Sequence, residues 1–156
     1  MDHYRVTDFP FRGSIGQLLG LAAILKDRLL DKHLIHLDIT AAQFKVLFFI
    51  GQNRANTPGE LCRELSIDSG SMTRMLDRLA KKDLLLRQPC PNDRRSVRLQ
   101  LSPAGEAVNA QAPQIAVRAM NELVGCLSPE ELLTLTRLLD KILASHGVAP
   151  GAAQEK

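Results

Sequence analysis

The fold is decided by the stretch SMTRMLDRLAKKDLLLRQPCPNDRRSVR, which occupies residues 71–98. Its first half predicts an amphipathic helix, because polar residues recur three or four positions apart on one face and apolar residues fill the opposite face. The polar face carries Ser71, Arg74, Arg78 and Lys81. Its second half predicts two short strands, over 84–88 and 96–101, that flank a turn at 91–95 with two arginines. A cationic helix face beside a basic hairpin tip is typical of proteins that bind duplex DNA.

The alternative for this helix is an ordinary solvated face, since arginine and lysine are common on protein surfaces. The elements before it favour the first interpretation. Thr40 is a suitable N-cap for the nearly all-apolar, buried helix that follows it, and the run TPGE at 57–60 predicts a capping box with proline at the first helical position. A tight turn at 66–68 then leads to the cationic helix, with Asp68 or Ser69 as its N-cap. Two short helices joined in this way predict a helix-turn-helix, and the hairpin after them makes it winged.

Long leucine-rich helices are predicted on both sides of this winged core. The first begins after Ser14 and the last begins in a second capping box at 128–131, and a helix interrupted by Pro113 lies between the core and the last one. The apolar stripes hold Ile15, Leu18 and Leu25 in the first helix and Leu132, Leu135, Leu139 and Ile142 in the last. These stripes need a partner, and they could cover each other within one chain or pack against the same ends of a second chain. We hypothesise that they form an intertwined homodimer interface with two-fold symmetry.

The fold class that follows is mainly α with a small β-hairpin: a winged helix-turn-helix with N- and C-terminal dimerisation helices. We expect an N-terminal arm and dimerisation helix over residues 1–36, the winged DNA-binding domain over 37–101, C-terminal dimerisation helices over 102–146 and a flexible tail over 147–156. The chain has 156 residues, of which 45% are hydrophobic and 24% are charged, and this composition is ordinary for a globular protein.

Positive charge is concentrated in the stretch that decides the fold. The net charge of the whole chain is +3, whereas residues 71–98 hold eight basic and three acidic side chains, a local charge of +5. Such a field suits a polyanionic partner and predicts salt-dependent binding. The three cysteines, Cys62, Cys90 and Cys126, include no CxxC pair, so neither a disulfide framework nor a zinc site is expected.

Other classes of protein find no support in the sequence. No apolar run approaches 18 residues and no signal-peptide pattern opens the chain, so we expect a cytoplasmic protein without membrane contact. No nucleophile elbow, phosphate loop, metal-ligand cluster or pair of carboxylates at a useful spacing is present, so we expect neither an enzyme nor a bound cofactor or metal. The alternative function is a winged-helix module for protein–protein interaction that has lost DNA binding. Such a module would have no need of the cationic face.

The residues expected to contact DNA lie on the cationic helix and at the hairpin tip. They are Ser69, Ser71, Thr73, Arg74, Arg78, Lys81, Arg94 and Arg95. Arginine can bond a guanine edge with two hydrogen bonds, serine and threonine can bond bases or phosphates, and arginine in a narrow A·T minor groove meets enhanced negative potential. Two acidic residues of this region have no reason to approach phosphate, and we expect them to support the wing. Asp93 would pair with Arg95 or with an arginine of the helix, and Asp77 would pair with Arg74.

Three strings of the chain carry a family resemblance: LDITAAQFKVL at 37–47, TRMLDRL at 73–79 and PNDRR at 91–95, the last followed by an alternating strand and the helix start SPAG at 102–105. They resemble the MarR (multiple antibiotic resistance regulator) family of bacterial transcription factors, and the resemblance covers roughly residues 14–146. It implies a triangular homodimer built by the first, fifth and sixth helices. It also implies a repressor-like regulator with a recognition helix in each of two consecutive major grooves of an inverted repeat and wing tips in the flanking minor grooves.

The resemblance further implies an effector, a small anionic aromatic molecule such as a phenolic carboxylate, that binds between the dimerisation and DNA-binding parts and releases the operator. A pocket there would be lined by the second helix and the ends of the first and fifth. The candidate partners of the anion are Arg28, Lys32, His33 and His36. The alternative is that these four residues are simply exposed to solvent. Hydroperoxide sensors of the family carry a reactive cysteine in the region of the first helix, whereas the first cysteine here is Cys62, which puts peroxide sensing by that route in doubt.

Overall fold

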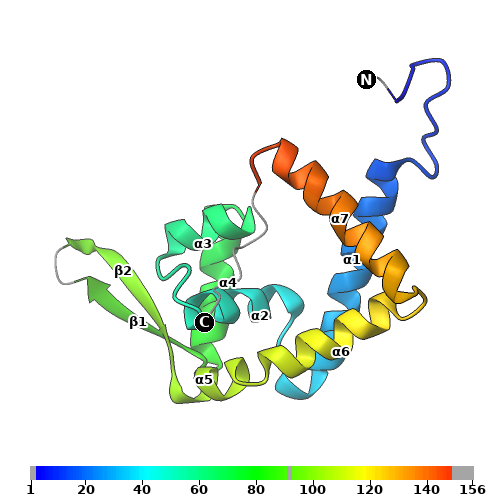
Figure 1. The fold of residues 1–156 in the computed structure, drawn as a ribbon. Coiled ribbons are helices and arrows are strands. Elements are labelled where there is room, and N and C mark those ends of the chain that lie inside the picture. Colours follow the sequence, from blue (N-terminus) through cyan, green and yellow to red (C-terminus); the bar gives the residue numbers. More distant parts are fainter. Residues whose placement is uncertain (1–2, 91–92, 149–156) are drawn as a thin grey trace. The chain divides into compact units, whose positions relative to one another are not determined.

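The computed structural model describes residues 3–90 and 93–148, and the side chains of these residues except 90 and 93–96. The chain is mainly helical with one β-hairpin, as the sequence predicts (Figure 1). The elements in chain order are α1 (Ile15–Leu34), the 3-10 helix η1 (Ile35–Leu37), α2 (Ala41–Gly51), α3 (Pro58–Leu65), α4 (Ser69–Lys81), β1 (Leu85–Cys90), β2 (Asp93–Leu101), α5 (Pro103–Asn109), α6 (Ala112–Val124) and α7 (Pro129–Ser145). Internal contacts divide the chain into two compact units, Met1–Ala119 and Met120–Lys156.

The helices that the sequence predicts begin at the residues expected to cap them. A side-chain oxygen of the N-cap accepts a hydrogen bond from the backbone N–H three residues ahead at Ser14, Thr40, Thr57, Asp68, Ser102 and Ser128. Three of these caps, before α2, α3 and α7, belong to complete capping boxes. Such caps satisfy N–H groups that the first turn of a helix leaves without partners, so the local sequence fixes these boundaries.

The helix-turn-helix consists of α3 and α4. Ser66 follows α3 in the left-handed backbone conformation (φ 51°), and this turns the chain toward the N-cap of α4 within three residues. The apolar side of α4 is fully buried, since Met72, Leu76 and Leu79 are no more than 2% exposed. Leu61 of α3 is equally buried. The predicted inward face of the cationic helix is therefore confirmed, and its polar face must point outward.

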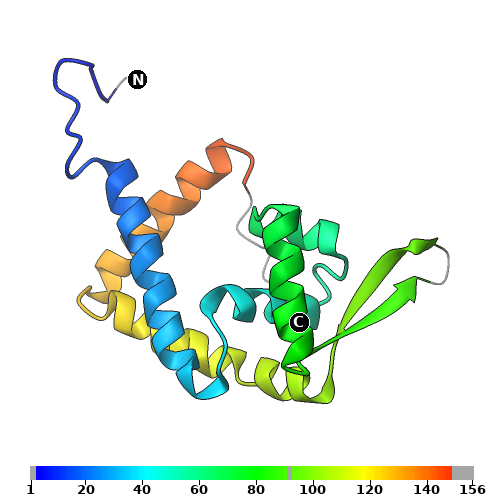
Figure 2. The same ribbon diagram turned by 180° about the vertical axis from the view of Figure 1, so that it is seen from behind.

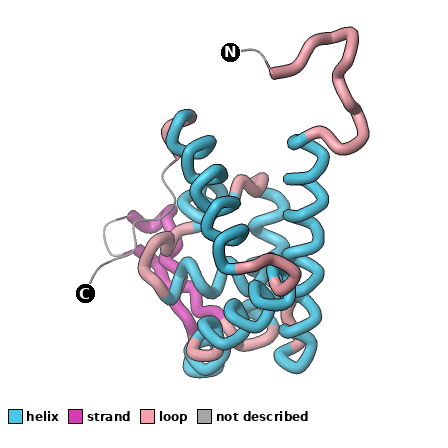
Figure 3. The backbone as a smooth tube through the Cα atoms, turned by 45° about the vertical axis from the view of Figure 1, so that its right-hand side comes forward, coloured by secondary structure: helices cyan, strands magenta, loops and turns pink. Residues whose placement is uncertain are grey.

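The wing is an antiparallel hairpin of β1 and β2 that extends away from α2, α3 and α4 (Figures 1 and 2). Among the described residues, strand structure occurs only in this hairpin (Figure 3). Leu99 lies opposite Arg87 in the register, and its N–H donates away from β1, to the carbonyl oxygen of Asn56 at 2.7 Å. Because N–H groups alternate between the two edges of a strand, Pro89 of β1, two residues beyond Arg87, also stands where the ladder needs no N–H.

The strands are longer than the sequence predicts. β2 begins at Asp93, so residues 93–95 belong to the strand and not to the expected turn, while residues 91–92 lie outside the described part. The pairing shifts register between Pro89 and Cys90, which lies opposite Asp93. Going back toward the turn, the alternation of apolar and polar side chains ends at Val97. The sequence pattern therefore could not show that β2 continues to Asp93, because this part of the strand depends on backbone pairing.

α5 anchors the base of the hairpin. Ser102, its N-cap, donates from its hydroxyl to the carbonyl oxygen of Asp83 and from its N–H to the carbonyl oxygen of Leu84, the latter at 3.3 Å. A Cβ at position 105 would lie 2.1 Å from that Leu84 oxygen. Only glycine permits so close an approach, so Gly105 lets α5 sit directly on the backbone that leads into β1.

Polar contacts fix the joint between α1 and α2. Asp31 Oδ1 accepts a hydrogen bond from the N–H of Ala41, at the start of α2, at 2.5 Å. Asp27 pairs with Lys45 across the two helices, with 2.8 Å between Oδ1 and Nζ. Partial burial raises the pKa of the Asp27 carboxyl, but hydrogen bonds and charge from Lys45 and Lys26 outweigh it and hold the pKa below its usual value. The lowered pKa keeps Asp27 ionised at neutral pH, so its ion pair with Lys45 helps to hold the joint.

The C-terminal helices expose much apolar surface. α6 begins one residue before Pro113, so the predicted interruption is confirmed and the proline stands in a first turn, where its missing N–H costs little. α7 contains no buried residue, and Leu135 and Leu138 are 43% and 54% exposed. No single helix among the described residues is long and apolar enough to cross a membrane. The segments Ile15–Leu37 and Ala41–Gly51 meet that test of length and composition only as a pair bent by 79°.

Candidate nucleic-acid interface

The outer face of α4 presents the DNA-contacting side chains predicted for this helix. Ser69, Thr73, Arg74, Arg78 and Lys81 are exposed, and Ser71 is half-buried. Arg74 Nη2 donates to Ser71 Oγ at 3.0 Å, and Thr73 Oγ1 donates to the carbonyl oxygen of Ser69 at 2.8 Å. These bonds orient the side chains along the helix, while most N–H groups of the guanidinium remain available to another partner.

Among the described residues, the three cations of this face have no ion-pair partner. Within the residues that the structure describes, no carboxylate oxygen lies within 4.0 Å of a side-chain nitrogen of Arg74, Arg78 or Lys81. Lys82, the next residue, differs: its Nζ lies 2.9 Å from Asp38 Oδ2 and also donates to the carbonyl oxygen of Asp38. Among the described residues Lys82 is therefore held in an ion pair and the other three cations are not, and these three give the outer face of α4 a positive field.

A carboxylate caps the start of the face. Asp68 Oδ1 accepts a hydrogen bond from the N–H of Ser71 at 2.8 Å. This bond is the main reason why the pKa of Asp68 lies below its usual value, with smaller contributions from the Ser71 hydroxyl and the charge of Arg74. An ionised carboxylate is favourable at a helix N-terminus, so the first turn of α4, which projects Ser71 and Arg74, is held in place at neutral pH.

An ion pair ties α4 to the wing. Asp77 Oδ1 lies 2.6 Å from Arg87 Nη2 of β1, whereas the sequence analysis expected Asp77 to pair with Arg74. That partner was wrong, because Arg74 turns toward Ser71 instead. Spacing along a helix indicates only local partners, and Arg87 comes from a different element. The pair is more than 40% exposed at both ends, so its effect on stability is small and its main consequence is to hold β1 beside α4.

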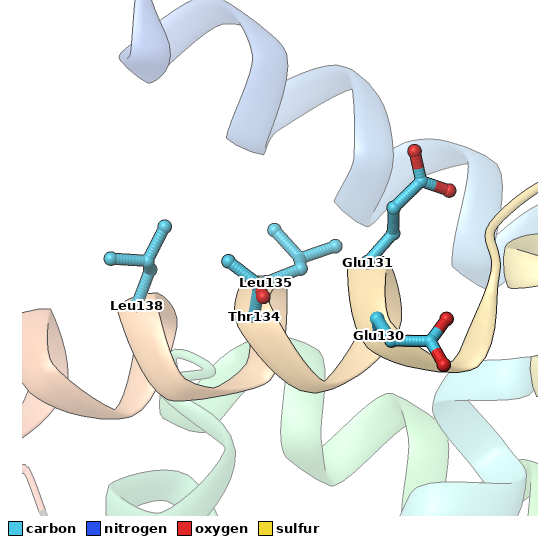
Figure 4. A pocket seen from close by; sticks show the side chains of 5 residues that line it. All are labelled: Glu130, Glu131, Thr134, Leu135 and Leu138. Carbon is cyan, nitrogen blue, oxygen red and sulfur yellow. The ribbon is translucent and has the colours of Figure 1, made fainter.

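The remaining predicted residues fall in other parts of the molecule. The side chains of Asp93, Arg94 and Arg95 lie outside the described part, although their backbone opens β2. The residues expected at a dimer interface are exposed in the single chain, apart from Leu139, which is half-buried: Ile15, Leu18, Leu25, Leu132, Leu135 and Ile142. On α7, Leu135, Leu138 and Glu131 project from the same side of the helix (Figure 4). With Glu130 and Thr134 they line a hollow of about 370 Å³.

Two hollows lie beside α4. One, of about 250 Å³, is lined by Thr40, Ala42, Gln43, Ser71, Arg74, Met75 and Arg78, and the other, of about 510 Å³, by Asp31, Ile35, Asp38, Ile39, Thr40, Gln43, Arg78 and Lys82. Arg78 reaches both. None of the four residues expected to bind an anion lines either hollow: His36 Nε2 lies 3.4 Å from Gln111 Oε1, and Arg28, Lys32 and His33 lie elsewhere on α1.

The chain has close relatives among characterised regulators. It is 45% identical over 130 residues to the multiple antibiotic resistance protein MarR of Escherichia coli K12, and the match covers 83% of this chain and 90% of that protein. The chain belongs to the MarR family. The MarR family model matches residues 39–97, which include α2, α3, α4, β1 and the first part of β2. This MarR-family chain is accordingly a DNA-binding transcription regulator with a winged helix-turn-helix.

Solved structures of MarR proteins have the same fold. A crystal structure of a mutant MarR from E. coli in complex with operator DNA is 45% identical, covers 83% of this chain and 93% of that one, and superimposes with a TM-score of 0.75. The reduced form of E. coli MarR is 44% identical and gives a TM-score of 0.78, with 83% and 96% of the two chains covered. BpsR of Bordetella bronchiseptica, whose DNA binding is regulated by 6-hydroxynicotinic acid, is 27% identical with a TM-score of 0.75 over 86% and 96% of the chains.

Proposed function

We propose that the chain is a homodimeric, cytoplasmic repressor that binds an inverted repeat in duplex DNA and leaves it when a small anionic aromatic ligand binds. The observation that supports DNA contact most directly is the row of unpaired cations on α4. Among the described residues Arg74, Arg78 and Lys81 form no ion pair, whereas Lys82 does, and a protein-interaction module would not need such a row of unpaired cations. Charges of this kind gain free energy when they replace the counterions of phosphate groups.

The recognition helix suits the major groove. α4 has 13 residues, and its inner side is held by buried side chains, so its outer side can enter the groove as a rigid unit. In this proposal Arg74 and Arg78 bond base edges, and Ser69, Ser71, Thr73 and Lys81 contact bases or phosphates near both ends of the helix. Arginine is the side chain that forms paired hydrogen bonds with guanine most often, which makes these two residues the main source of sequence preference.

The wing supplies the second contact. We place Arg94 and Arg95 in a minor groove beside the major groove that α4 occupies, where their charge would meet the negative potential of a narrow A·T segment. The Asp77–Arg87 pair supports this arrangement, because it links the helix and the first strand of the wing at 2.6 Å. Asp93, predicted to brace the tip, would act at the opposite end of the hairpin.

The exposed leucines support a dimer. α7 buries none of its residues in the single chain, and α1 exposes Ile15, Leu18 and Leu25 along one stripe. In water such stripes are stable only when they are covered. A two-fold axis would place two copies of α4 about 34–36 Å apart, one turn of B-form DNA, and this spacing requires an inverted repeat.

The hollows beside α4 support release by a ligand. The smaller one contains both Arg74 and Arg78, with Met75 as an apolar wall. An aromatic carboxylate bound there would engage the same guanidinium groups that the proposal assigns to DNA, so that ligand and operator would compete. The relative regulated by 6-hydroxynicotinic acid shows that a small aromatic acid can act on a protein of this fold.

A salt titration tests the proposal. Fluorescence anisotropy should show that the purified protein binds an inverted repeat from the DNA upstream of its own gene, with log Kd rising linearly with log salt. Arg95→Ala should weaken binding about evenly across sequences and reduce the salt slope by about one. A DNA affinity that does not depend on salt concentration or on DNA sequence would instead favour the protein-interaction module. The absence of any DNA binding at low salt would favour it as well.

A further inference from the structure

A separate hollow lies along the free edge of the wing. It has a volume of about 310 Å³ and shares no residue with the two hollows beside α4. Its lining comes from the end of α2, the loop after it, β2 and the start of α5: Ile50, Gly51, Asn53, Asn56, Arg98, Leu99, Gln100, Leu101 and Glu106. A space of this size is at the lower end of the range for small-molecule sites and matches a compact molecule.

Backbone groups of β2 face this space. Leu99 donates its N–H away from β1, to the carbonyl oxygen of Asn56 at 2.7 Å. In an antiparallel strand the N–H and C=O of one residue point to the same edge, and every second residue points to that edge. The C=O of Leu99 and the N–H of Leu101 therefore also point away from β1. Both residues line the hollow, so one backbone acceptor and one backbone donor are directed toward it.

Opposite charges stand on two walls of the hollow. Arg98 comes from β2 and Glu106 from the first turn of α5, and both side chains are exposed. Within the described residues neither charge has an ion-pair partner, and the two do not pair with each other within 4.0 Å. Asn53 and Gln100, which carry amide side chains, also belong to the lining. The hollow thus offers a cation, an anion and neutral hydrogen-bonding groups in one small volume.

We propose that this hollow binds a small zwitterion of the α-amino-acid class, with its carboxylate on Arg98 and its ammonium group on Glu106. A simple anion would also face the Glu106 carboxylate, and a simple cation would face the Arg98 guanidinium. An apolar molecule would leave both charges and the amides without partners, which is unfavourable. A zwitterion satisfies both walls with charge-assisted hydrogen bonds, and its own amide or hydroxyl can meet Asn53 or Gln100. The hollow then acts as a second ligand site, distinct from the aromatic-acid site of the proposed function.

Calorimetry on the full-length protein without DNA tests this site, so its outcome is independent of operator binding. Each standard α-amino acid is titrated singly, and at least one should bind with a Kd below about 1 mM. Acetate and methylammonium, which carry one charge each, should bind at least about tenfold more weakly. Arg98→Gln and Glu106→Gln should each weaken binding by about tenfold or more, while the matched α7 variants Arg137→Gln and Glu130→Gln should leave it unchanged.

Amide chemical shifts of the wild-type protein provide a readout that does not depend on the variants folding. The ligand should shift the Leu99, Gln100 and Leu101 signals and leave those of α7 in place. The proposal is overturned if no amino acid binds at about 10 mM, if binding survives both substitutions, or if the half-ligands bind as tightly as the zwitterion. Shifts confined to residues outside the hollow would overturn it as well.

Discussion

Helices α4 and α7 have similarly built N-termini, each with a side-chain oxygen that accepts from the third N–H, but the chain treats their apolar residues in opposite ways. α4 buries Met72, Leu76 and Leu79 completely and exposes cations. α7 buries nothing and exposes leucines. Full burial of one such side chain contributes about 1.5–3 kcal/mol, so α4 is stabilised within one chain and α7 is left without that contribution.

This difference separates two tasks. The recognition helix must be rigid before DNA arrives, because ordering it during binding would reduce affinity. The C-terminal helix can depend on a second copy of the chain, because the proposed repressor needs two copies in order to match an inverted repeat. The four experiments below test this division, beginning with the largest expected effect.

Charging the apolar stripe of α7 should abolish dimerisation. The double variant Leu135→Glu/Ile142→Glu places two carboxylates on the stripe, and sedimentation should show a monomer at micromolar concentration. Since a monomer engages only one half-site, operator affinity should fall by at least about 100-fold. Leu133→Glu is the matched control, because this exposed leucine lies on the opposite side of α7 and its substitution should leave the dimer intact. A double variant that remains dimeric would show that α7 is covered in another way.

Removing an arginine from α4 should weaken operator binding without affecting the dimer. Arg74→Ala or Arg78→Ala should cost about 1–3 kcal/mol, a loss of about 5- to 150-fold in affinity, and relax discrimination at one base pair. Anisotropy with operators substituted at single positions measures both effects. Arg137→Ala, at an exposed cation of α7, serves as the control and should stay within about twofold. Equal losses on operator and on unrelated DNA would mean that the arginine contacts only phosphate.

Removing the ion pair between α4 and the wing should reduce operator affinity less than the loss of Arg74 or Arg78. Asp77→Asn and Arg87→Ala each remove the 2.6 Å ion pair, and because both side chains are largely exposed the coupling in unfolding free energy should be only about 0.2–1 kcal/mol. Operator affinity should fall by about two- to fivefold as the wing loses its orientation. A double-mutant cycle measures the coupling. Strictly additive losses in both stability and operator affinity would mean that Asp77 and Arg87 are not coupled, and would contradict a role for this ion pair.

Lowering the pH should reduce the stability that the Asp68 cap of α4 contributes, and this is the smallest of the four expected effects. The pKa of Asp68 is lowered below its ordinary value of 3.8, mainly by the N–H of Ser71, so its contribution to stability is present above that value and disappears as the pH falls through the lower pKa of the folded state. In α7 the oxygen that accepts from the third N–H is the hydroxyl of Ser128, which does not titrate, and the carboxylate of Glu131 accepts only from the N–H of Ser128 itself. Thermal unfolding of the wild type and of Asp68→Ser should therefore differ more at about pH 6 than at about pH 3. A difference that is the same at both pH values would contradict this role of the carboxylate.

The features that sequence reasoning predicted correctly depend on neighbours along the chain. N-caps, capping boxes, the interruption at Pro113 and the two faces of α4 all follow from residues a few positions apart. The pairing of Asp77 with Arg87, the pairing of Lys82 with Asp38 and the extension of β2 to Asp93 depend on how separate elements meet. The same reason explains the hollows. Thr40, Gln43 and Met75 line one of them because α2 lies near α4, and nothing in their local sequence marks them as ligand contacts.

The proline in β1 has a consequence for how the hairpin finds its alignment. If β1 slipped by one residue against β2, Pro89 would come to a site where the neighbouring strand requires a donor, and Leu85 of the same strand would turn from the interior into water. Both penalties act against the same mistake, one through the backbone and one through the side chains. The alignment of the hairpin is therefore selected twice, and this keeps the backbone of residues 94 and 95 at one place along β2.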